Sequence, residues 1–390
     1  MKIAMIGQKG MPAIYGGVEK HAQDLASRLI LSGHKVIVYS RKWYTKKDDC
    51  EINGVTIKHL PSIHTKHLDT ITHSFLATIH AMISRCDVIH YHGVGPSLVA
   101  WMPRLFAPKT KVIATFNSID RYHQKCGWFA KFILRLGEWS ACQFPHETIT
   151  VSKGLYNYCL NEFKKETVYI PNGVELSENV EGDELIARFG LKKNEYLLMV
   201  SRLVPHKGAH VLIAAFNAFK KESRDNKLKL AIVGGSVHTE KYFTALREIA
   251  ADNSDIVFTD FQSNETLNAL YNNCAAFAHP SFNEGLPITV LQAMAAGRTV
   301  LLSAIEAHLE LSQNAEIFFK ENNVSDLKKK LTDFISWSDE KRKKIGEENR
   351  RIVAENYDWK KIVADTIEVY LKSAPLRDYF CPAVKVNISR

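Results

Sequence analysis

The sequence has few cysteines, and none of them form close pairs. Seven are scattered along the chain without a C-x-x-C motif: Cys50, Cys86, Cys126, Cys142, Cys159, Cys274 and Cys381. This spacing excludes a zinc-binding cysteine pair and argues against the disulfide framework of small secreted domains. We therefore expect reduced thiols and a cytoplasmic location.

Long apolar runs are absent as well. The sequence has no stretch of about 18 apolar residues, so it predicts no transmembrane helix. The apolar run at residues 1–7 is too short for a signal peptide and is typical of a first β-strand. A cytoplasmic protein that reaches a membrane would have to do so from the inner face, as a peripheral contact.

Charge of one sign does not dominate the composition. Lys and Arg number 51 and Asp and Glu number 42, which gives a net charge of +9. This balance suits an anionic ligand or an anionic membrane surface. No zinc cysteine pairs or RNA-binding sheet signature occur, so we expect no nucleic-acid partner. The length of 390 residues and the ordinary hydrophobic content of 46% favour two or three globular domains.

Short apolar runs alternate with helix-length periodic segments, which predicts an α/β fold with parallel sheets. The predicted strands are 2–6, 35–40, 55–60, 87–91, 111–116, 147–151 and 167–170, then about 195–201, 229–233, 255–258, 275–279, 299–302 and 316–319. The pattern breaks near Asn172, where a polar acidic stretch follows. We therefore predict two doubly wound domains, 1–172 and 173–357, that face each other across a cleft.

Residues 280–287 carry the most informative pattern. Glu284 and Gly285 lie just before Pro287, which suits the first position of the apolar helix that follows. The unpaired N–H groups of a first helical turn and the helix dipole attract an anion. Glu284 could then hold neutral hydroxyls beside that anion. The alternative is an ordinary strand–loop–helix unit with a solvated Glu.

A second loop carries two cations. Arg202 and Lys207 follow the apolar run 196–200 and precede a helix predicted over roughly 208–220. Cations at the carboxyl end of a parallel strand point into the crevice where such sheets bind ligands. A guanidinium and an ammonium there can clamp a diphosphate and offset charge on a leaving nucleotide. Either cation alone would more simply be a surface charge.

Together the two loops resemble the donor site of retaining GT-B glycosyltransferases of the large family often called family 4. In that family the Arg and Lys bind the donor diphosphate and the first Glu holds the donor sugar; Arg202, Lys207 and Glu284 match those positions. The resemblance covers about residues 3–372. It implies two Rossmann-like domains, a last segment (about 358–390) that returns to the first domain, and a donor site that includes Gly285, Leu286, Ile288 and Gln292.

One donor-site position departs from the family pattern. A second acidic residue, which binds ribose hydroxyls, is expected where this chain has Gln292. An amide carbonyl also accepts hydrogen bonds, so we expect nucleotide binding to survive, weaker by roughly 1 kcal/mol.

The loop after the first strand contains Gly16 and Gly17, which let the backbone approach a ligand closely at the start of a helix. The spacing is neither a GxGxxG dinucleotide fingerprint nor a GxxxxGK[ST] loop. The run is similar to "G-x-P-A-x-Y-G-G-x-E" of a rhamnosyltransferase-like bacterial polysaccharide subfamily, in which this loop lies between donor and acceptor. The alternative is a glycine-rich turn without a ligand.

Four residues are expected on the acceptor side. His92 ends a predicted strand, although a single His in such a place is more often structural. Asn117 stands where the subfamily usually has a His, and an amide can bind a sugar hydroxyl but cannot take up a proton at neutral pH. Asp120 and Arg121 follow in the same loop.

Aromatic residues and cations mix over residues 121–135. This is typical of an interfacial helix that seats an enzyme on an anionic membrane holding a lipid-linked acceptor. The alternative is an amphipathic helix packed on its own domain.

These observations predict a retaining glycosyltransferase that uses a nucleotide-diphosphate sugar and a glycan or lipid-linked acceptor, in bacterial surface-polysaccharide or glycolipid assembly. Arg202, Lys207 and Glu284 are the candidate catalytic residues. No cofactor is expected, and since the cations can supply a metal's electrostatic effect, neither is a metal. The alternatives are a sugar-nucleotide epimerase or hydrolase, a catalytically weakened nucleotide-sugar-binding subunit, and, least favoured, a nucleic-acid binder.

Overall fold

The structure is a computed structural model of the chain. It describes residues 1–14, 16–45, 50–65, 68–122, 127–176, 182–223, 225–235 and 239–372, apart from the side chains at 122 and 129. Residues 373–390 of the predicted last segment (about 358–390) lie outside the described residues, as does part of the predicted segment 121–135. None of the helices in the described part combines the length and the apolar character needed to cross a bilayer.

The first half forms an eight-stranded sheet with the order β3-β4-β2-β1-β5-β6-β7-β8. Its strands are β1 (Lys2–Ile6), β2 (Lys35–Arg41), β3 (Cys50–Ile52), β4 (Val55–Leu60), β5 (Val88–His92), β6 (Lys111–Phe116), β7 (Glu147–Thr150) and β8 (Val168–Tyr169). Its helices are α1 (Gly17–Leu31), α2 (Asp69–Ile83), α3 (Trp101–Phe106), α4 (Trp128–Gln143) and α5 (Lys153–Phe163), with short 3-10 turns at η1 (Pro96–Val99) and η2 (Asp120–Tyr122).

The second half forms a six-stranded parallel sheet with the order β11-β10-β9-β12-β13-β14. Its strands are β9 (Tyr196–Val200), β10 (Lys229–Val233), β11 (Ile256–Phe258), β12 (Ala276–His279), β13 (Thr299–Ser303) and β14 (Phe318–Phe319). The helices, with two 3-10 turns, are α6 (Asp183–Ala187), η3 (Pro205–Lys207), α7 (Ala209–Glu222), α8 (Glu240–Ala250), α9 (Asn264–Asn273), α10 (Ile288–Ala295), α11 (Glu306–Leu309), η4 (Ala315–Ile317), α12 (Val324–Ser336), α13 (Asp339–Asn356) and α14 (Trp359–Lys372).

All the predicted strands are present, and one strand was missed. β3 pairs antiparallel with β4 at the edge of the first sheet. Asn53 and Gly54 connect them with φ angles of 51° and 79°, the backbone of a tight hairpin turn. An Asn-Gly pair is the strongest short signal for such a turn, so the sequence contained this hairpin.

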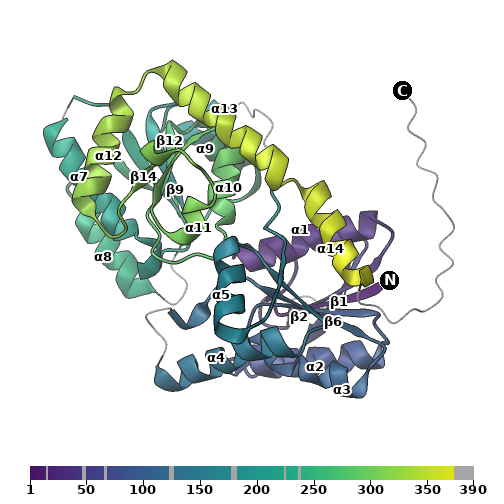
Figure 1. The fold of residues 1–390 in the computed structure, drawn as a ribbon. Coiled ribbons are helices and arrows are strands. Elements are labelled where there is room, and N and C mark those ends of the chain that lie inside the picture. Colours follow the sequence, from purple (N-terminus) through teal and green to yellow (C-terminus); the bar gives the residue numbers. More distant parts are fainter. Residues whose placement is uncertain are drawn as a thin grey trace, which may run out of the picture.

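Helices cover both faces of the first sheet. Leu25 of α1 packs with Ile362 and Tyr370 of α14 on one face, while Ala77 of α2 and Ala141 of α4 belong to the core on the other face. Because both faces are covered, strands such as β6 are buried along their whole length. Figure 1 shows α14, in yellow, leaving the second half of the chain and lying beside α1.

The chain passes between the two halves at two neighbouring places. Val174 N–H donates to the carbonyl of Tyr357 at 2.9 Å, which joins the outgoing and the returning segments. A Cβ atom at Gly173 would lie 2.5 Å from the indole of Trp359, so only glycine fits there. The division near residue 172 agrees with the change of sheet, but the exact domain bounds stay a prediction.

Candidate functional site

Two loops at the carboxyl edge of the second sheet carry the predicted donor residues, and they bring Lys207 and Glu284 into contact while Arg202 is exposed. The loop with Arg202 and Lys207 follows β9, and the loop with Glu284 follows β12. These strands are neighbours at the point where the strand order reverses. Parallel α/β sheets bind ligands at such a point, because the loops of the two strands diverge to opposite faces.

Main-chain contacts hold the two loops against each other. Phe282 N–H donates to the carbonyl of His206 at 2.8 Å, and the hydroxyl of Ser281 donates to the same carbonyl at 3.1 Å. Gly208 has a φ of 72°, and a Cβ there would overlap the carbonyl of Pro280. The glycine therefore permits the close approach on which the loop geometry depends.

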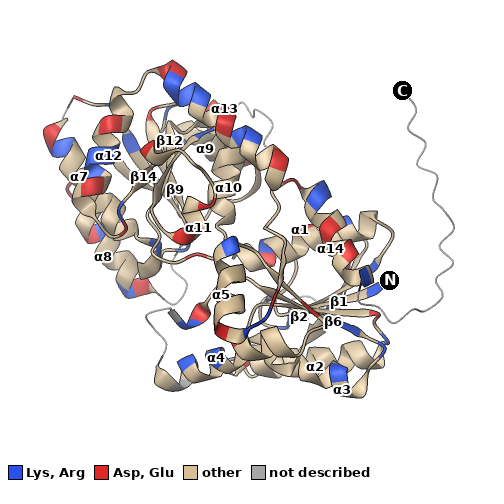
Figure 2. Cartoon of the chain, viewed as in Figure 1, with Lys and Arg blue, Asp and Glu red and all other residues tan. Residues whose placement is uncertain are grey.

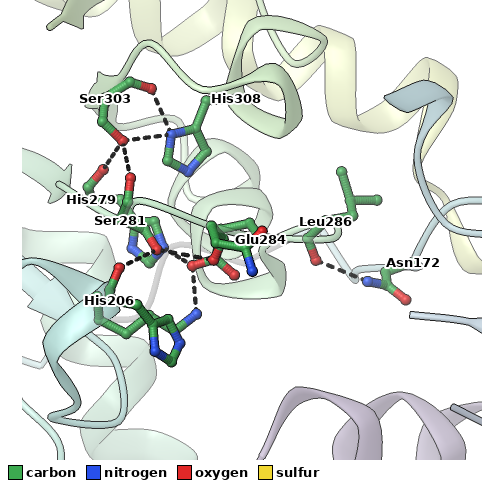
Figure 3. A network of polar contacts seen from close by, with 10 residues as sticks. Asn172, His206, His279, Ser281, Glu284, Leu286, Ser303 and His308 are labelled. Atoms are coloured by element: carbon green, nitrogen blue, oxygen red, sulfur yellow. Dashed lines mark hydrogen bonds and ion pairs between the residues drawn. The ribbon is translucent and has the colours of Figure 1, made fainter. Parts of the chain in front are cut away.

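Lys207, His279 and Glu284 meet at a single oxygen atom. Lys207 Nζ lies 2.5 Å from Glu284 Oε1, and His279 Nε2 lies 2.8 Å from the same atom. Figure 3 shows Glu284 beside His279, with Ser281 and His206 close by. Within the described part of the chain, Glu284 Oε2 has no hydrogen-bond partner, so this oxygen is available to a ligand.

The electrostatics keep this carboxylate ionised although it is buried. Burial by itself would raise the pKa of Glu284, but Lys207 and the hydrogen bond from His279 outweigh it and hold the pKa well below its usual range. Burial lowers the pKa of His279, so its neutral ring donates from Nε2. The result is a fixed negative charge whose position is set before a ligand arrives.

A second histidine supports the first and was missed by the sequence analysis. His308 Nδ1 lies 2.8 Å from the carbonyl of Ser303, and its ring centroid is 5.3 Å from that of His279. Burial lowers the pKa of His308 to about 3. The sequence analysis also missed His279, which its place at the end of a predicted buried strand could have identified. No sequence pattern indicates that His308 packs against His279.

A third cation, Lys9, approaches the donor loops from the first half of the molecule. Burial lowers the pKa of Lys9, Glu19 opposes this effect, and the positive charge of Arg202 lowers the pKa further. This effect acts between the two halves, since Lys9 follows β1 and Arg202 follows β9. Lys9 lies in the same loop as Gly16 and Gly17, but only the glycines were predicted to bind a ligand.

The carboxyl edges of the two sheets are in direct contact around Gly285. A Cβ at Gly285 would overlap the carbonyl oxygen of Asn117. The adjacent Leu286 accepts a hydrogen bond at 3.0 Å from the buried amide of Asn172, as Figure 3 shows. Gly285 and Asn117, two predicted site residues from opposite halves, are thus neighbours. Asn172 also forms a contact between the halves, although the sequence analysis treated it only as the domain boundary.

Helices α1 and α10 begin beside each other. A Cβ at Gly17 would lie 3.6 Å from Ile288 Cδ1, in ordinary contact, while a Cβ at Gly16 would overlap the carboxylate of Glu19. Gly16 precedes α1 with a φ of 106°. The position of Pro287 needs correction: its ψ of 106° is extended, so α10 begins one residue later, at Ile288.

Gln292 is already engaged by a protein group. Its Oε1 accepts a hydrogen bond at 3.3 Å from the hydroxyl of Tyr271. Burial raises the pKa of Tyr271 well above its usual range, so the hydroxyl stays protonated and donates. A carbonyl oxygen has two lone pairs, and one remains for a ligand hydroxyl.

Of the residues predicted on the acceptor side, His92 lies deepest in the first half. His92 is only 2% exposed, its ring lies 4.2 Å from that of His90, and burial lowers its pKa well below the usual range. It lies in the interior because β5 is buried along its whole length. Within the described residues neither of its ring nitrogens has a hydrogen-bond partner, and its place on the acceptor side stays a prediction.

Arg121 contacts residues of its own domain, and its place on the acceptor side stays a prediction. Its Nε donates to the buried carboxylate of Glu138 at 3.2 Å, and its NH2 group donates to the hydroxyl of Tyr158 at 2.9 Å. A buried carboxylate needs such a partner. Asp120 accepts a hydrogen bond at 2.6 Å from the hydroxyl of Ser118, which leaves Asn117 as the acceptor-side prediction nearest to the donor loops.

The chain matches two glycosyltransferase family models. Residues 15–178 match "Glycosyltransferase Family 4" and residues 183–352 match "Glycosyl transferases group 1". The chain is a GT-B glycosyltransferase.

Three similar proteins illustrate the match. An uncharacterized glycosyltransferase of Methanocaldococcus jannaschii is 27% identical, over 95% of this chain and 98% of its own. The N,N'-diacetylbacillosaminyl-diphospho-undecaprenol alpha-1,3-N-acetylgalactosaminyltransferase of Campylobacter jejuni is 28% identical, over 49% of this chain and 51% of its own. The crystal structure of Anabaena HepE in complex with UDP and glucose has a TM-score of 0.77 at 19% identity, and the match covers 95% and 99% of the two chains.

Proposed function

We propose that this glycosyltransferase moves a sugar from a nucleotide-diphosphate sugar to a glycan or lipid-linked acceptor with retention of configuration, in bacterial surface-polysaccharide or glycolipid biosynthesis. The observation that carries the proposal is the contact of Lys207 and His279 with one oxygen of Glu284, at the reversal point of the second sheet. Such a preorganised ion pair suits a ligand that is anionic at one end and rich in hydroxyls at the other.

Each end of the donor has a complementary group. Arg202 and Lys207 bind the diphosphate and stabilise the charge that develops on it as the nucleotide leaves. Glu284 accepts hydrogen bonds from sugar hydroxyls through Oε2, and the fixed oxygen Oε1 keeps that side chain in place. The N–H groups at the start of α10 add a partial positive charge to the same region. Lys9 approaches from the opposite half and adds to the positive field.

Retention follows from attack on the face from which the leaving group departs. The bond from the anomeric carbon to the phosphate oxygen breaks, and the acceptor oxygen bonds to that carbon. The acceptor proton passes to the departing phosphate oxygen, and a nucleoside diphosphate is released. The fixed charges assist this step because they stabilise the departing phosphate without rearranging. No protein nucleophile and no metal are required.

Support for the acceptor comes from a relative. The name of the Campylobacter jejuni enzyme specifies a diphospho-undecaprenol-linked substrate. A lipid-linked acceptor would hold the enzyme at the inner face of a membrane. The predicted contact through residues 121–135 is part of the proposal, and α4, which includes the second part of that segment, exposes Trp128 and Phe132.

The test is calorimetric titration with a panel of nucleotide-diphosphate sugars, with and without a metal chelator, while nucleoside diphosphate release is followed on the same samples. We expect one donor to bind tightly, with slow release until acceptor is added. The anomeric configuration of the product, read by NMR, tests retention. Binding without release, even with acceptor extracts, would favour a weakened binding subunit, and no binding at all would contradict the assignment of the donor site.

A further inference from the structure

The ion pair between Lys207 and Glu284 lies deep for charged side chains. Figure 2 shows that the charged residues of the second half lie mainly on its outer helices, such as α7, α8, α12 and α13. The side chains of Lys207 and Glu284, in contrast, are only 15% and 9% exposed. Charges at this depth are stable only when each one is compensated, so neither partner can lose the other without a replacement.

A bound diphosphate would compete with Glu284 for Lys207. The diphosphate of the proposed donor carries more negative charge than a carboxylate, and it offers several acceptor oxygens to the three N–H groups of the ammonium. The ammonium lies on a flexible four-carbon stem, so it can follow the diphosphate. One positive charge cannot fully compensate two anions, so Glu284 then depends on its second contact, which is His279.

His279 is held in place by packing, and its ring has one polar contact. The side chain is 1% exposed, and the ring packs against those of Phe277 and His308, with centroid distances of 5.9 Å and 5.3 Å. Within the described residues Nδ1 has no hydrogen-bond partner, whereas Nε2 lies 2.8 Å from Glu284 Oε1. An ionised carboxylate only accepts, so the proton of the neutral ring is on Nε2. This donor is uncharged and fixed, so a diphosphate does not draw it away as it draws an ammonium.

We infer that His279 is a positioning residue, which holds Glu284 for the donor sugar once the diphosphate has taken over Lys207. In this exchange Lys207 Nζ turns to the phosphate oxygens, the bond from His279 Nε2 to Glu284 Oε1 remains, and Glu284 Oε2 accepts a sugar hydroxyl. The inference rests on the proposed function and adds a basis for specificity. A nucleoside diphosphate takes Lys207 but brings no donor sugar to Glu284, so only the sugar nucleotide benefits from His279.

Two variants separate the N–H group of His279 from its ring. His279→Phe keeps an aromatic ring against Phe277 and His308 but removes the donor, whereas His279→Gln keeps an N–H donor and removes the ring. Calorimetric titration compares the affinity for each nucleotide-diphosphate sugar of the donor panel with that for the corresponding nucleoside diphosphate.

The expected result is a loss that is confined to the sugar nucleotide. In His279→Phe we expect its affinity to fall by about tenfold or more, as for the loss of one hydrogen bond to a charged group, while the nucleoside diphosphate binds as it does to wild type. The kcat for transfer should fall by a similar factor. His279→Gln should recover part of both losses, because its amide still donates to Glu284.

A crystal structure with the nucleoside diphosphate tests the exchange itself. We expect Lys207 Nζ within hydrogen-bond distance of a phosphate oxygen and away from Glu284, with the bond between His279 and Glu284 unchanged. A structure in which Lys207 stays on Glu284, or in which Glu284 leaves His279, would contradict the inference.

The control is His34→Ala, which removes an imidazole at the start of β2 in the first half and should change neither affinity. Equal losses for both ligands in His279→Phe and His279→Gln would assign His279 a purely structural role, and unchanged affinities and turnover would show that it is dispensable. Either result overturns the inference. Nucleoside diphosphate binding to each variant also shows that the variant is folded.

The outcome is distinguishable from that of the proposed function. If the wild-type chain binds no sugar nucleotide, the proposed function fails and the inference fails with it. If wild type binds a sugar nucleotide and His279→Phe binds it equally well, the inference fails alone.

Discussion

The two halves of the molecule bring polar side chains to their carboxyl edges in different ways. In the second half, Lys207 and Glu284 meet each other across two short loops. In the first half, Arg121 turns back to Glu138, and His92 is buried. The second half therefore presents a charged site that is formed before a ligand arrives, whereas in the first half Arg121 stabilises a buried carboxylate of its own domain.

The physical reason is the energetic demand of burial. A buried carboxylate requires hydrogen bonds or a counter-charge. Glu284 obtains both from residues that the donor loops already supply, and one oxygen is left over. Glu138 lies in the helix layer with 0% exposure, so it pairs with Arg135 of the same helix and with Arg121 of the preceding loop.

The largest expected effect tests the charged site. Lys207→Ala removes the ammonium that contacts Glu284 and the donor diphosphate, so we expect turnover to fall by ~10²-fold or more. Steady-state kinetics with the donor found by titration measure this, and the exposed Lys193→Ala is the control. Unchanged turnover would mean that the pair is structural, like Arg121 and Glu138.

The next change tests the contact between the two halves. Gly285→Ala places a methyl group into the carbonyl of Asn117. We expect kcat to fall by about tenfold or more and stability to fall by about 1–3 kcal/mol, because one loop must move. Kinetics and thermal unfolding measure the two effects. Gly127→Ala, where a Cβ would meet open space, should change neither; equal effects of both variants would refute the steric argument.

A weaker effect is expected from the hydrogen bond between the halves. Asn172→Ala removes the bond from the side-chain amide to the carbonyl of Leu286, and leaves that carbonyl without this donor. We expect a loss of about 1 kcal/mol in the free energy of unfolding, measured by denaturant titration. A stability equal to that of wild type would mean that water replaces the amide.

A further contact between the halves should depend on pH. Glu310 Oε2 accepts a hydrogen bond at 2.9 Å from Lys153 N–H at the start of α5. Burial raises the pKa of Glu310 to about 7 from its ordinary 4.5, although the N–H groups of Lys153 and Gly154 oppose this. Because burial favours the protonated acid, the contribution of Glu310 to the free energy of unfolding is largest below pH 4.5, declines as the pH rises to about 7, and is then constant.

The variant Glu310→Gln isolates that dependence. It cannot ionise, so the decline in stability between pH 4.5 and 7 should be smaller than in wild type, and the measurement is thermal unfolding across this range. Glu321→Gln is the control, since Glu321 is an exposed carboxylate outside this contact. An identical pH profile for wild type and Glu310→Gln would show that Glu310 does not titrate there.

The smallest effect is expected at the acceptor-side position that departs from the family. Asn117 meets Gly285 through its main-chain carbonyl, so Asn117→His should preserve the contact between the halves. We expect activity equal to wild type or higher in a nucleoside diphosphate release assay. A complete loss of activity would mean that the Asn117 amide has a specific role of its own. The first half would then contribute a side chain to the reaction, in contrast to the comparison above.

The sequence alone determined the α/β fold, the parallel strands and the donor loops. Buried parallel strands are continuous apolar runs and their loops are short, so local pattern places Arg202, Lys207 and Glu284 at the ends of strands. Because neighbouring strands share one carboxyl edge, a short-range pattern was enough to predict residues that lie 2.5 Å apart across two loops.

Only the tertiary structure decided the direction in which the other side chains point. The sequence could not show that His92 is covered by its neighbours, that Arg121 pairs with Glu138, or that the charge of Arg202 acts on Lys9 of the other half. Their partners come from distant segments, and the burial that fixes their orientation arises when layers pack. Strand ends follow from local pattern, whereas side-chain partners between layers and between domains follow from the packing of the whole chain.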